Sequence, residues 1–382
     1  MTASAEAPTL DPADTPDWKL FTGSRVPHPG IARLPPPPRW RPPADPVLKE
    51  RPLLDPRQPE TWPARARRGA DFQATDAIIE MVNAALYLRR PLLVTGRPGS
   101  GKSSLAAAVA HELALGAPLR WSVTSTATLR DALYLYDAIG RLQDERSDRP
   151  EAAGGASTRA AARARRSAPD SARETAAHIG RYVRLGPLGT ALLPTSRPRV
   201  LLIDEIDKSD LDLPNDLLNT FEEGEFDILE LRRLAWEGPV TVYTDDDQQP
   251  TVEIVGGRVH CAQFPLMVLT SNGERDFPAP FLRRCLRLDM PNPTGNKPTD
   301  DNAEGWRLRE IIALHFTAEE RRTADALIDE FVGRVTRGEL DNVATDQLLN
   351  AVHFVVHGKL GVTEERKKVL GALTRELIGP RG

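Results

Sequence analysis

The sequence predicts an α/β fold, in which a parallel sheet is covered by helices on both faces, followed by a region that is only helical. Three observations support this prediction. Short apolar runs typical of buried strands alternate with segments of helical periodicity between residues 75 and 290. A glycine-rich loop at residues 96–103 joins the first of these strands to a helix. From residue 301 onward, apolar residues recur only at helical spacing, which indicates three or four packed helices.

Composition limits the class of protein. The 382 residues are 40% hydrophobic and 27% charged, which is typical of a globular protein of two or more domains. A formal net charge of −4 gives no overall attraction toward nucleic acid. Cys261 and Cys285 lack metal-ligand spacing, and the acidic, proline-containing N-terminus does not have the pattern of a signal peptide. No apolar run approaches membrane-spanning length, so we expect a cytoplasmic protein without a membrane span.

Residues 1–66 are expected to form a proline-rich, largely extended arm. Residues 1–63 contain 16 of the 34 prolines, and the run at 35–43 predicts polyproline II. Such a segment cannot build a core of its own. Its aromatic side chains are candidate anchors to the folded body or to a partner: Trp18, Phe21, Trp40 and Trp62. The alternative is a disordered tail whose aromatic residues are incidental.

The core domain is expected at residues 67–292. It begins with a helix at 75–88, a strand at 91–95, a helix at 104–113 and a strand at 119–124. An alanine- and glycine-rich stretch at 143–176 then predicts a mobile insertion, with basic side chains at Arg159, Arg163, Arg165 and Arg166. Contact of these arginines with nucleic acid is the alternative, although no aromatic residues are interleaved with them.

The second half of the core adds strands at 200–203, 265–270 and 286–290, and a helix at 213–223 that ends at Gly224. Residues 226–261 resemble β-hairpin material, with strands at 251–255 and 258–261 on either side of Gly256 and Gly257. A helical domain is expected at 300–382. Its apolar residues at helical spacing are Ile311, Ile312, Leu314, Phe316, Ala326, Leu327, Phe331, Val332, Val335, Leu348, Leu349, Val352 and Val355.

Residues 96–103 match the phosphate-binding pattern G-x-x-x-x-G-K-S between a strand and a helix. The glycines let the backbone turn so that its N–H groups converge on phosphate oxygens, and the helix N-terminus attracts the same anion. Lys102 would reach the β- and γ-phosphates, and the Ser103 hydroxyl would ligate Mg²⁺. The predicted binding residues are Gly96, Arg97, Pro98, Gly99, Ser100, Gly101, Lys102, Ser103 and Ser104. The alternative is a glycine-rich turn with an incidental lysine.

Asp204 and Glu205 follow directly on the apolar strand at 200–203, at the edge where parallel sheets place their ligands. Asp204 would bind Mg²⁺, directly or through water, and Glu205 would orient the attacking water. This pair favours hydrolysis of ATP over kinase or GTPase chemistry; an acidic turn is the alternative. Asp207 and Asp210 are expected to be a helix cap and solvated surface.

Three further residues are candidates for catalysis. Asn272 follows the strand at 265–270 and can reach between the γ-phosphate and the water. Arg283 and Arg284 stand 11 and 12 residues after Asn272, and in the expected sheet order they cannot easily reach their own nucleotide. One of them could serve the nucleotide of a neighbouring subunit in a ring and stabilise transition-state charge in trans. A surface salt bridge is the alternative for each, and the sequence does not distinguish the two arginines.

These residues resemble the AAA+ ATPases, and more narrowly the MoxR-like branch, over about residues 70–360. The matching stretches are 96–103, 186–188, 203–208, 216–224, 270–272 and 281–284. The resemblance implies a three-layer αβα P-loop NTPase core with a helical lid, ATP and Mg²⁺ as cofactors, and Asn272 as the sensor-1 residue. It also implies a hexameric ring that remodels protein complexes, often with a partner that bears a von Willebrand factor A domain.

One departure affects the lid. The family usually carries an arginine near the start of a late lid helix, in contact with the γ-phosphate, whereas residues 343–349 contain none. Either Gln347 substitutes for it or lid closure responds less to nucleotide. The main hypothesis is an oligomeric ATPase that remodels or activates a protein partner. A nucleic-acid motor or loader and a nucleotide-controlled signalling scaffold are the alternatives, and the arm and the insertion are expected to set partner choice.

Overall fold

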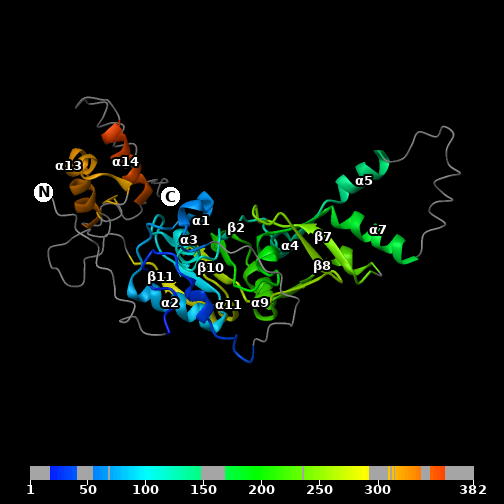
Figure 1. Ribbon diagram of the computed structural model, residues 1–382. Helices are drawn as coiled ribbons and strands as arrows, with labels where there is room; N and C mark the ends of the chain where they lie inside the picture. The colour runs from blue at the N-terminus through cyan, green and yellow to red at the C-terminus, as the bar shows by residue number, and fades with distance from the viewer. Residues whose placement is uncertain are drawn as a thin grey trace.

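The structure, a computed structural model, describes residues 18–40, 55–67, 69–147, 168–234, 236–291, 309, 312–313, 315–336 and 345–357. Figure 1 shows a central body with helices α5 (Ala138–Ser147) and α7 (Ala168–Gly180) projecting at one end. Helices α13 (Ala318–Thr336) and α14 (Thr345–His357) lie at the other end. Among the described helices, none combines the length and the apolar character that a membrane crossing requires.

A five-stranded parallel sheet forms the centre of the body, in the order β11-β1-β10-β5-β2. Its strands are β1 (Leu92–Thr95), β2 (Leu119–Ser122), β5 (Val200–Asp204), β10 (Leu266–Ser271) and β11 (Leu286–Asp289). Every residue of β5 and β10 is buried, as expected of central parallel strands that are covered on both faces. The predicted α/β class and the predicted strands are confirmed.

Alternate residues of each strand point to opposite faces, and each face has its own hydrophobic cluster. Leu92 and Val94 of β1 pack with α2 (Asp76–Leu88) and α3 (Lys102–Glu112). Leu93 points to the other cluster, which includes residues of α8 (Pro187–Ala191) and α9 (Leu213–Glu223). Because strand side chains alternate with a period of two, this division establishes the three-layer αβα arrangement.

The helix boundaries follow local signals in the sequence. Helix α9 has the bounds predicted for it and ends where Gly224 adopts a left-handed conformation, with φ of 67°. The short helix α4 (Leu129–Leu133) begins with a capping box between Thr128 and Asp131. The remaining short elements are η3 (Ile206–Lys208), α10 (Leu229–Arg232) and α11 (Ala279–Arg284).

A second sheet extends from the body toward α5 and α7, in the order β3-β4-β7-β8. Its strands are β3 (Tyr134–Tyr136), β4 (Val183–Leu185), β7 (Pro239–Tyr243) and β8 (Thr251–Val255). Helix α5 follows β3 and α7 leads into β4, so both ends of the expected insertion at 143–176 are helical rather than irregular. Residues 148–167, with the four arginines, lie outside the described residues.

The predicted pairing across Gly256 and Gly257 is wrong. Strand β8 pairs with β7 over five residues, whereas β9 (Arg258–His260) pairs with β6 (Glu225–Asp227) in a separate two-stranded sheet. Both glycines have positive φ, as in a hairpin turn, but the Gly257 carbonyl accepts a hydrogen bond from the Ile228 N–H. That contact fixes the chain beside β6 and directs β9 away from β8.

Part of the proline-rich arm packs on the body. Phe21 and Trp62 are buried, which confirms the anchor interpretation for these two residues. Phe21 joins the cluster of α2 and α3, while Trp62 packs near α1 (Ala64–Arg67) and Ala114. Trp18 lies edge-on against Tyr87, and Trp40 is 78% exposed. Two short 3-10 helices occur in the arm, η1 (Pro29–Arg33) and η2 (Pro59–Thr61).

The described part of the C-terminal region has its own core. Phe331 and Val332 of α13 pack with Val352 and Val355 of α14 and with Ile312. These residues confirm the helical spacing predicted for this region. Ile311 and Leu314 lie outside the described residues, as do residues 358–382 and the stretch 292–308.

Candidate functional site

The loop between β1 and α3 has the backbone geometry that its glycines predict. Gly96, Gly99 and Gly101 all have positive φ, of 146°, 73° and 87°. Side chains with a Cβ rarely adopt such angles, so glycine at these positions permits the tight turn. Gly101 is the residue before the first turn of α3, whose unpaired N–H groups therefore face the loop.

Lys102, the first residue of α3, is buried, and its ammonium group lies inside the loop. Its Nζ donates hydrogen bonds to the carbonyl oxygens of Gly96 at 2.6 Å and Arg97 at 2.9 Å. Burial lowers the pKa of Lys102, and the carboxylates of residues 204–207 oppose that shift. The positive charge is thus held between the loop and the acidic end of β5.

Asp204, at the end of β5, is almost completely enclosed by donors. Its Oδ1 accepts hydrogen bonds from Ser103 Oγ at 2.8 Å and Thr270 Oγ1 at 2.7 Å. Its Oδ2 accepts from Arg120 Nη2 at 2.5 Å. Although burial by itself raises the pKa of Asp204, the hydrogen bonds from these three side chains hold it below its ordinary value. The carboxylate is therefore held as an anion beside the first turn of α3.

Glu205 is set apart from Asp204 by its backbone. It has a left-handed conformation, with φ of 61° and ψ of 48°, which is uncommon for a residue with a side chain. A hydrogen bond from its N–H to Thr270 Oγ1, at 2.9 Å, supports this turn. The carboxylate is 43% exposed and pairs with Lys208 Nζ at 2.9 Å. Two adjacent carboxylates are thereby given different surroundings, one buried and fully bonded, the other accessible.

Asp207 does not have the role expected of it. It is only 3% exposed, and its Oδ2 accepts hydrogen bonds from the N–H groups of Asn272 at 2.8 Å and Glu274 at 3.2 Å. The expectation of a solvated cap was wrong because it considered only neighbours along the chain, whereas β10 brings residues 272–274 to this point. Asp210 is exposed, as predicted.

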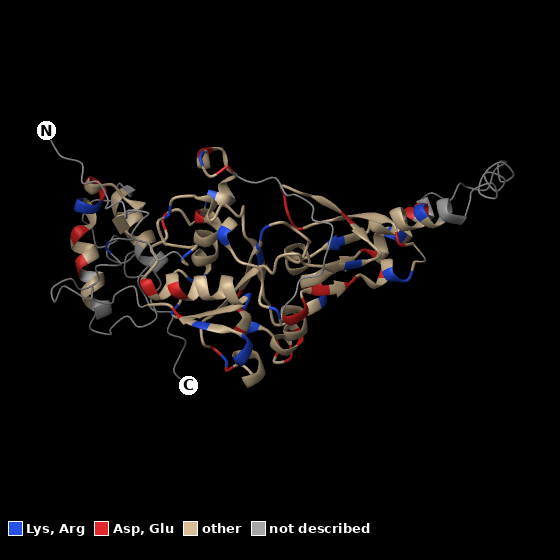
Figure 2. Cartoon of the chain, turned by 60° about the horizontal axis from the view of Figure 1, so that its bottom comes forward, with Lys and Arg blue, Asp and Glu red and all other residues tan. Residues whose placement is uncertain are grey.

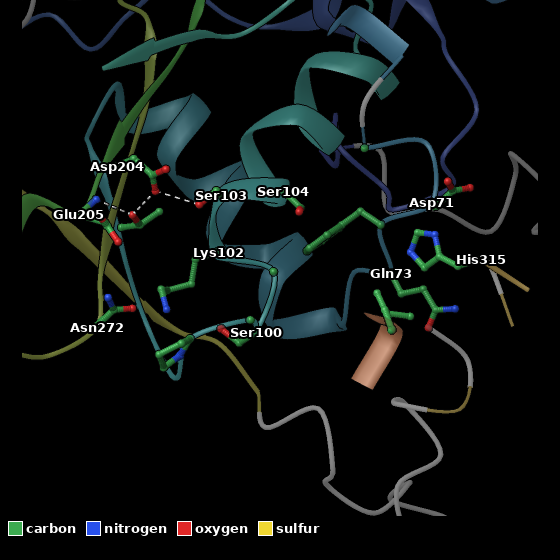
Figure 3. Close-up of a pocket in the computed structure, with 17 residues that line it drawn as sticks. Asp71, Gln73, Ser100, Lys102, Ser103, Ser104, Asp204, Glu205, Asn272 and His315 are labelled. Atoms are coloured by element: carbon green, nitrogen blue, oxygen red, sulfur yellow. Dashed lines mark hydrogen bonds between the residues drawn. The ribbon is translucent and has the colours of Figure 1, made fainter. Parts of the chain in front are cut away.

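These groups meet at a cavity of about 540 Å³, a size typical of ligand sites. The cavity is lined by residues 98–104, by Asp204 and Glu205, and by Thr270 and Asn272. Figure 3 shows Lys102, Ser103, Asp204, Glu205 and Asn272 gathered on one side. The other end is formed by residues 69 and 71–73 together with His315 and Leu349 from the C-terminal region, and Asp71, Gln73 and His315 are seen there in Figure 3.

The two candidate arginines on α11 lie outside this cavity and differ in their contacts. Arg284 is half-buried and forms an ion pair with Glu222 of α9. Arg283 is exposed, and its side chain has no hydrogen bond or ion pair within the described chain. Arg90 donates hydrogen bonds to the carbonyl oxygens of both, at the end of the helix. The helix end is therefore fixed while one guanidinium remains accessible.

The comparison with known families agrees with this geometry. Residues 91–257 match the family described as AAA domain (dynein-related subfamily). The chain contains an AAA domain. AAA domains in general are ATPases that bind ATP with Mg²⁺, and they often form oligomers. No curated protein matches the chain. The match ends at Gly257, so Asn272, Arg283 and Arg284 lie beyond it, although β10 and β11 belong to the same sheet.

The residues of the AAA domain fit ATP and Mg²⁺. Ser100 Oγ is buried in the cavity lining and has no hydrogen-bond partner in the described chain, so it could donate a hydrogen bond to a phosphate oxygen. Mg²⁺ prefers oxygen ligands and usually takes only one or two from protein, the rest coming from phosphates and water. Ser103 and Asp204 supply such oxygens. The described residues contain no group of three or more His, Cys, Asp or Glu side chains that could hold a metal without phosphate.

Some residues of the site were not found by sequence reasoning. Arg120 and Thr270 contact Asp204 from the neighbouring strands β2 and β10. Thr270 is a polar residue near the carboxyl end of its strand, which was an available signal, whereas Arg120 lies near the start of β2 and carried none. Residues 69–73 and His315 carried no signal, because they reach the cavity only through the fold. Gln347 lies in α14, two residues before Leu349, and its side chain lies outside the described part.

Proposed function

We propose that this chain is a MoxR-like AAA+ ATPase that couples ATP binding and hydrolysis to the remodelling or activation of a protein partner. One observation carries the proposal. The glycine-rich loop, the acidic end of β5 and Asn272 converge on one cavity at the carboxyl edge of a parallel sheet. That edge is where open α/β sheets bind their ligands. The match of residues 91–257 to the AAA domain supports the same reading.

The geometry supports a different role for each group of site residues. The N–H groups at the start of α3, together with Lys102 and Ser100, would bind the phosphates. Ser103 and Asp204 would hold Mg²⁺, which neutralises phosphate charge when it is bound. Glu205 would accept a hydrogen bond from the attacking water and orient it, because its carboxylate lines the cavity and is accessible. Asn272 would bind the same water or the γ-phosphate from the end of the neighbouring strand β10.

We further propose that Arg283 acts in trans in a homo-oligomer. Arg283 is accessible and lies outside the cavity of its own chain, while Arg284 is held by Glu222. A guanidinium that reaches a neighbour's γ-phosphate would stabilise the charge of the transition state. A closed ring, such as a hexamer, supplies one such neighbour for every site. This assignment chooses between two arginines that the sequence did not distinguish.

The kind of partner is proposed from the resemblance and from charge. Figure 2 shows Lys and Arg interspersed with Asp and Glu along the described chain, and the formal net charge of the sequence is −4, so charge does not favour nucleic acid as the partner. A protein client or adaptor, including one with a von Willebrand factor A domain, therefore remains the proposed partner. The arm and the insertion at 143–176 are the proposed determinants of partner choice, and the cytoplasm remains the predicted compartment.

Two variants test the proposal. Glu205→Gln keeps the shape of the side chain but removes the carboxylate, so ATP binding should persist while hydrolysis is lost. Lys102→Ala should abolish ATP binding. Binding is measured by calorimetry with Mg²⁺ present, turnover by phosphate release and assembly by light scattering. Hydrolysis by Glu205→Gln at the parent rate would exclude the water-orienting role. ATP-dependent assembly that needs Lys102 but is unaffected by Glu205→Gln, in a parent with negligible turnover, would favour the scaffold alternative.

A further inference from the structure

Two segments at the ends of neighbouring strands are joined by several hydrogen bonds. The first runs from the last residue of β5, Asp204, to Ser209, and the second from the last two residues of β10, Thr270 and Ser271, to Arg275. Thr270 Oγ1 accepts a hydrogen bond from Glu205 N and donates one to Asp204. Arg275 Nη1 donates to the Ser209 carbonyl oxygen at 3.1 Å. The first segment carries both proposed catalytic carboxylates, and the second carries Asn272.

Asp207 lies at the centre of this junction. Its Oδ2 accepts the N–H groups of both Asn272 and Glu274, at 2.8 and 3.2 Å. The residue between them, Gly273, has φ of 78°, and its N–H donates to Ser271 Oγ at 3.0 Å. Successive N–H groups around a left-handed residue form a concave anion site, so residues 272–274 make a backbone nest that holds the Asp207 carboxylate.

The contact is built to be rigid. Asp207 is 3% exposed, and hydrogen bonds from N–H groups to a carboxylate are shorter and stronger than those between neutral groups. A Cβ added at Gly273 would meet no atom within 4 Å, so the positive φ, and not crowding, accounts for the glycine. Asn272 therefore has a fixed backbone, and its side chain enters the cavity from a fixed point.

We propose that Asp207 is a positioning residue, which sets the distance between Asn272 and the catalytic carboxylates by binding the backbone of residues 272–274. This inference rests on the proposed function of Asn272 and Glu205. Asp207 does not line the cavity and would touch neither ATP nor water. Its hydrogen bonds act on the site through the backbone of residues 272–274, and its negative charge also raises the pKa of Lys102. Asp207→Asn removes the charge but keeps an oxygen acceptor, so the positioning effect is separable from the charge effect.

The test is a double-mutant cycle on the full chain. Asp207→Ala removes the acceptor of both N–H groups and should lower kcat by about 10²-fold, the effect of a displacement near 1 Å, while the Kd for ATP changes little. Asp207→Asn retains one oxygen acceptor in the same shape and should recover most of kcat. In an Asn272→Ala background, Asp207→Ala should add little, because the side chain that it positions is gone. Asp210→Ala, at an exposed position three residues away, is the matched control.

The outcomes separate the inference from the function on which it rests. Thermal unfolding of each variant shows whether it is folded. If Asp207→Ala does not fold, Gly273→Ala serves in its place, because it disturbs the backbone nest instead of the carboxylate that the nest binds. A parent chain whose hydrolysis is unaffected by Glu205→Gln would overturn the proposed function itself. If Glu205→Gln is inactive but Asp207→Ala is as active as the parent, only the positioning role is overturned. The positioning role would also be overturned if Asp207→Ala lowered kcat by the same factor in the parent and in the Asn272→Ala background.

Discussion

One buried carboxylate makes several of the hydrogen bonds that hold the proline-rich arm on the body, which makes its contribution testable with a single atom change. Glu112, the last residue of α3, has a side chain only 1% exposed. Its Oε1 accepts hydrogen bonds from Thr22 N at 2.6 Å, Thr22 Oγ1 at 2.9 Å and Gly23 N at 3.2 Å. Its Oε2 accepts one from Arg25 N at 3.1 Å. Glu112→Gln replaces one of these oxygens by an amino group and removes the charge.

The expected cost follows from these contacts. In its better orientation the glutamine keeps the Oε1 contacts but leaves the Arg25 N–H facing another donor, and the remaining bonds lose their charge assistance. Together these changes should cost about 2 kcal/mol. For a domain of this size that corresponds to a fall in Tm of about 4–8 °C. If the loss is confined to the arm, the undocked population should rise by about 30-fold.

Limited proteolysis and thermal unfolding measure the two effects. Trypsin cleavage after Arg25, followed by mass spectrometry, tracks the undocked population when cleavage is slow compared with redocking. Glu80→Gln, at an exposed position on α2, is the matched control and should resemble the parent. Unchanged Tm together with unchanged cleavage after Arg25 in Glu112→Gln would refute the idea that Glu112 holds the arm.

Two further predictions concern the proposed active site. Arg283→Ala should lower turnover by about 10³-fold, and mixing it with Lys102→Ala should restore part of the rate because the intact halves meet at one interface. Arg284→Ala should instead lower Tm, because it removes the ion pair with Glu222. If Arg284→Ala lowered turnover and Arg283→Ala lowered only Tm, Arg284 would be the residue that acts in trans. Arg120→Gln should lower the Mg²⁺ concentration for half-maximal hydrolysis by about threefold, because an exposed cation beside Asp204 repels the metal. A higher Mg²⁺ requirement would show that Arg120 orients Asp204 for the metal instead.

The parts of the fold that the sequence predicted well are those with local causes. Helix α9 has an apolar stripe, a proline in its first turn and Gly224 at its end, so its bounds were predictable to the residue. Strands β5 and β10 are continuous apolar runs, which central parallel strands require. The glycine-rich loop combines a strict residue pattern with backbone angles that only glycine adopts readily. In each case the decisive interaction lies within a few residues along the chain.

The errors arose where the cause is distant in sequence. Gly256 and Gly257 have turn geometry, yet the strands on either side of them do not pair with each other. β8 pairs with β7 and β9 pairs with β6, and both of these partners lie earlier in the sequence. Asp207 was taken for a surface residue because its donors lie more than sixty positions away. The second sheet was missed because β3 and β4 have only three residues each and are separated by α5, the undescribed stretch and α7. Strands so short have no periodicity that sequence analysis can detect.

Helix α3 connects the arm to the proposed phosphate site. Its first residue, Lys102, lies in the glycine-rich loop, and its last, Glu112, binds the arm. A helix of 11 residues spans only about 16 Å and does not bend easily, because each turn is bonded to the next. A partner that draws the arm away would leave the Glu112 carboxylate without the N–H and hydroxyl donors of the arm. The loss of these hydrogen bonds would destabilise the C-terminal end of α3, the helix whose first residue is Lys102. The arm therefore offers a physical route by which partner binding and nucleotide binding could influence each other, without any contact between partner and nucleotide.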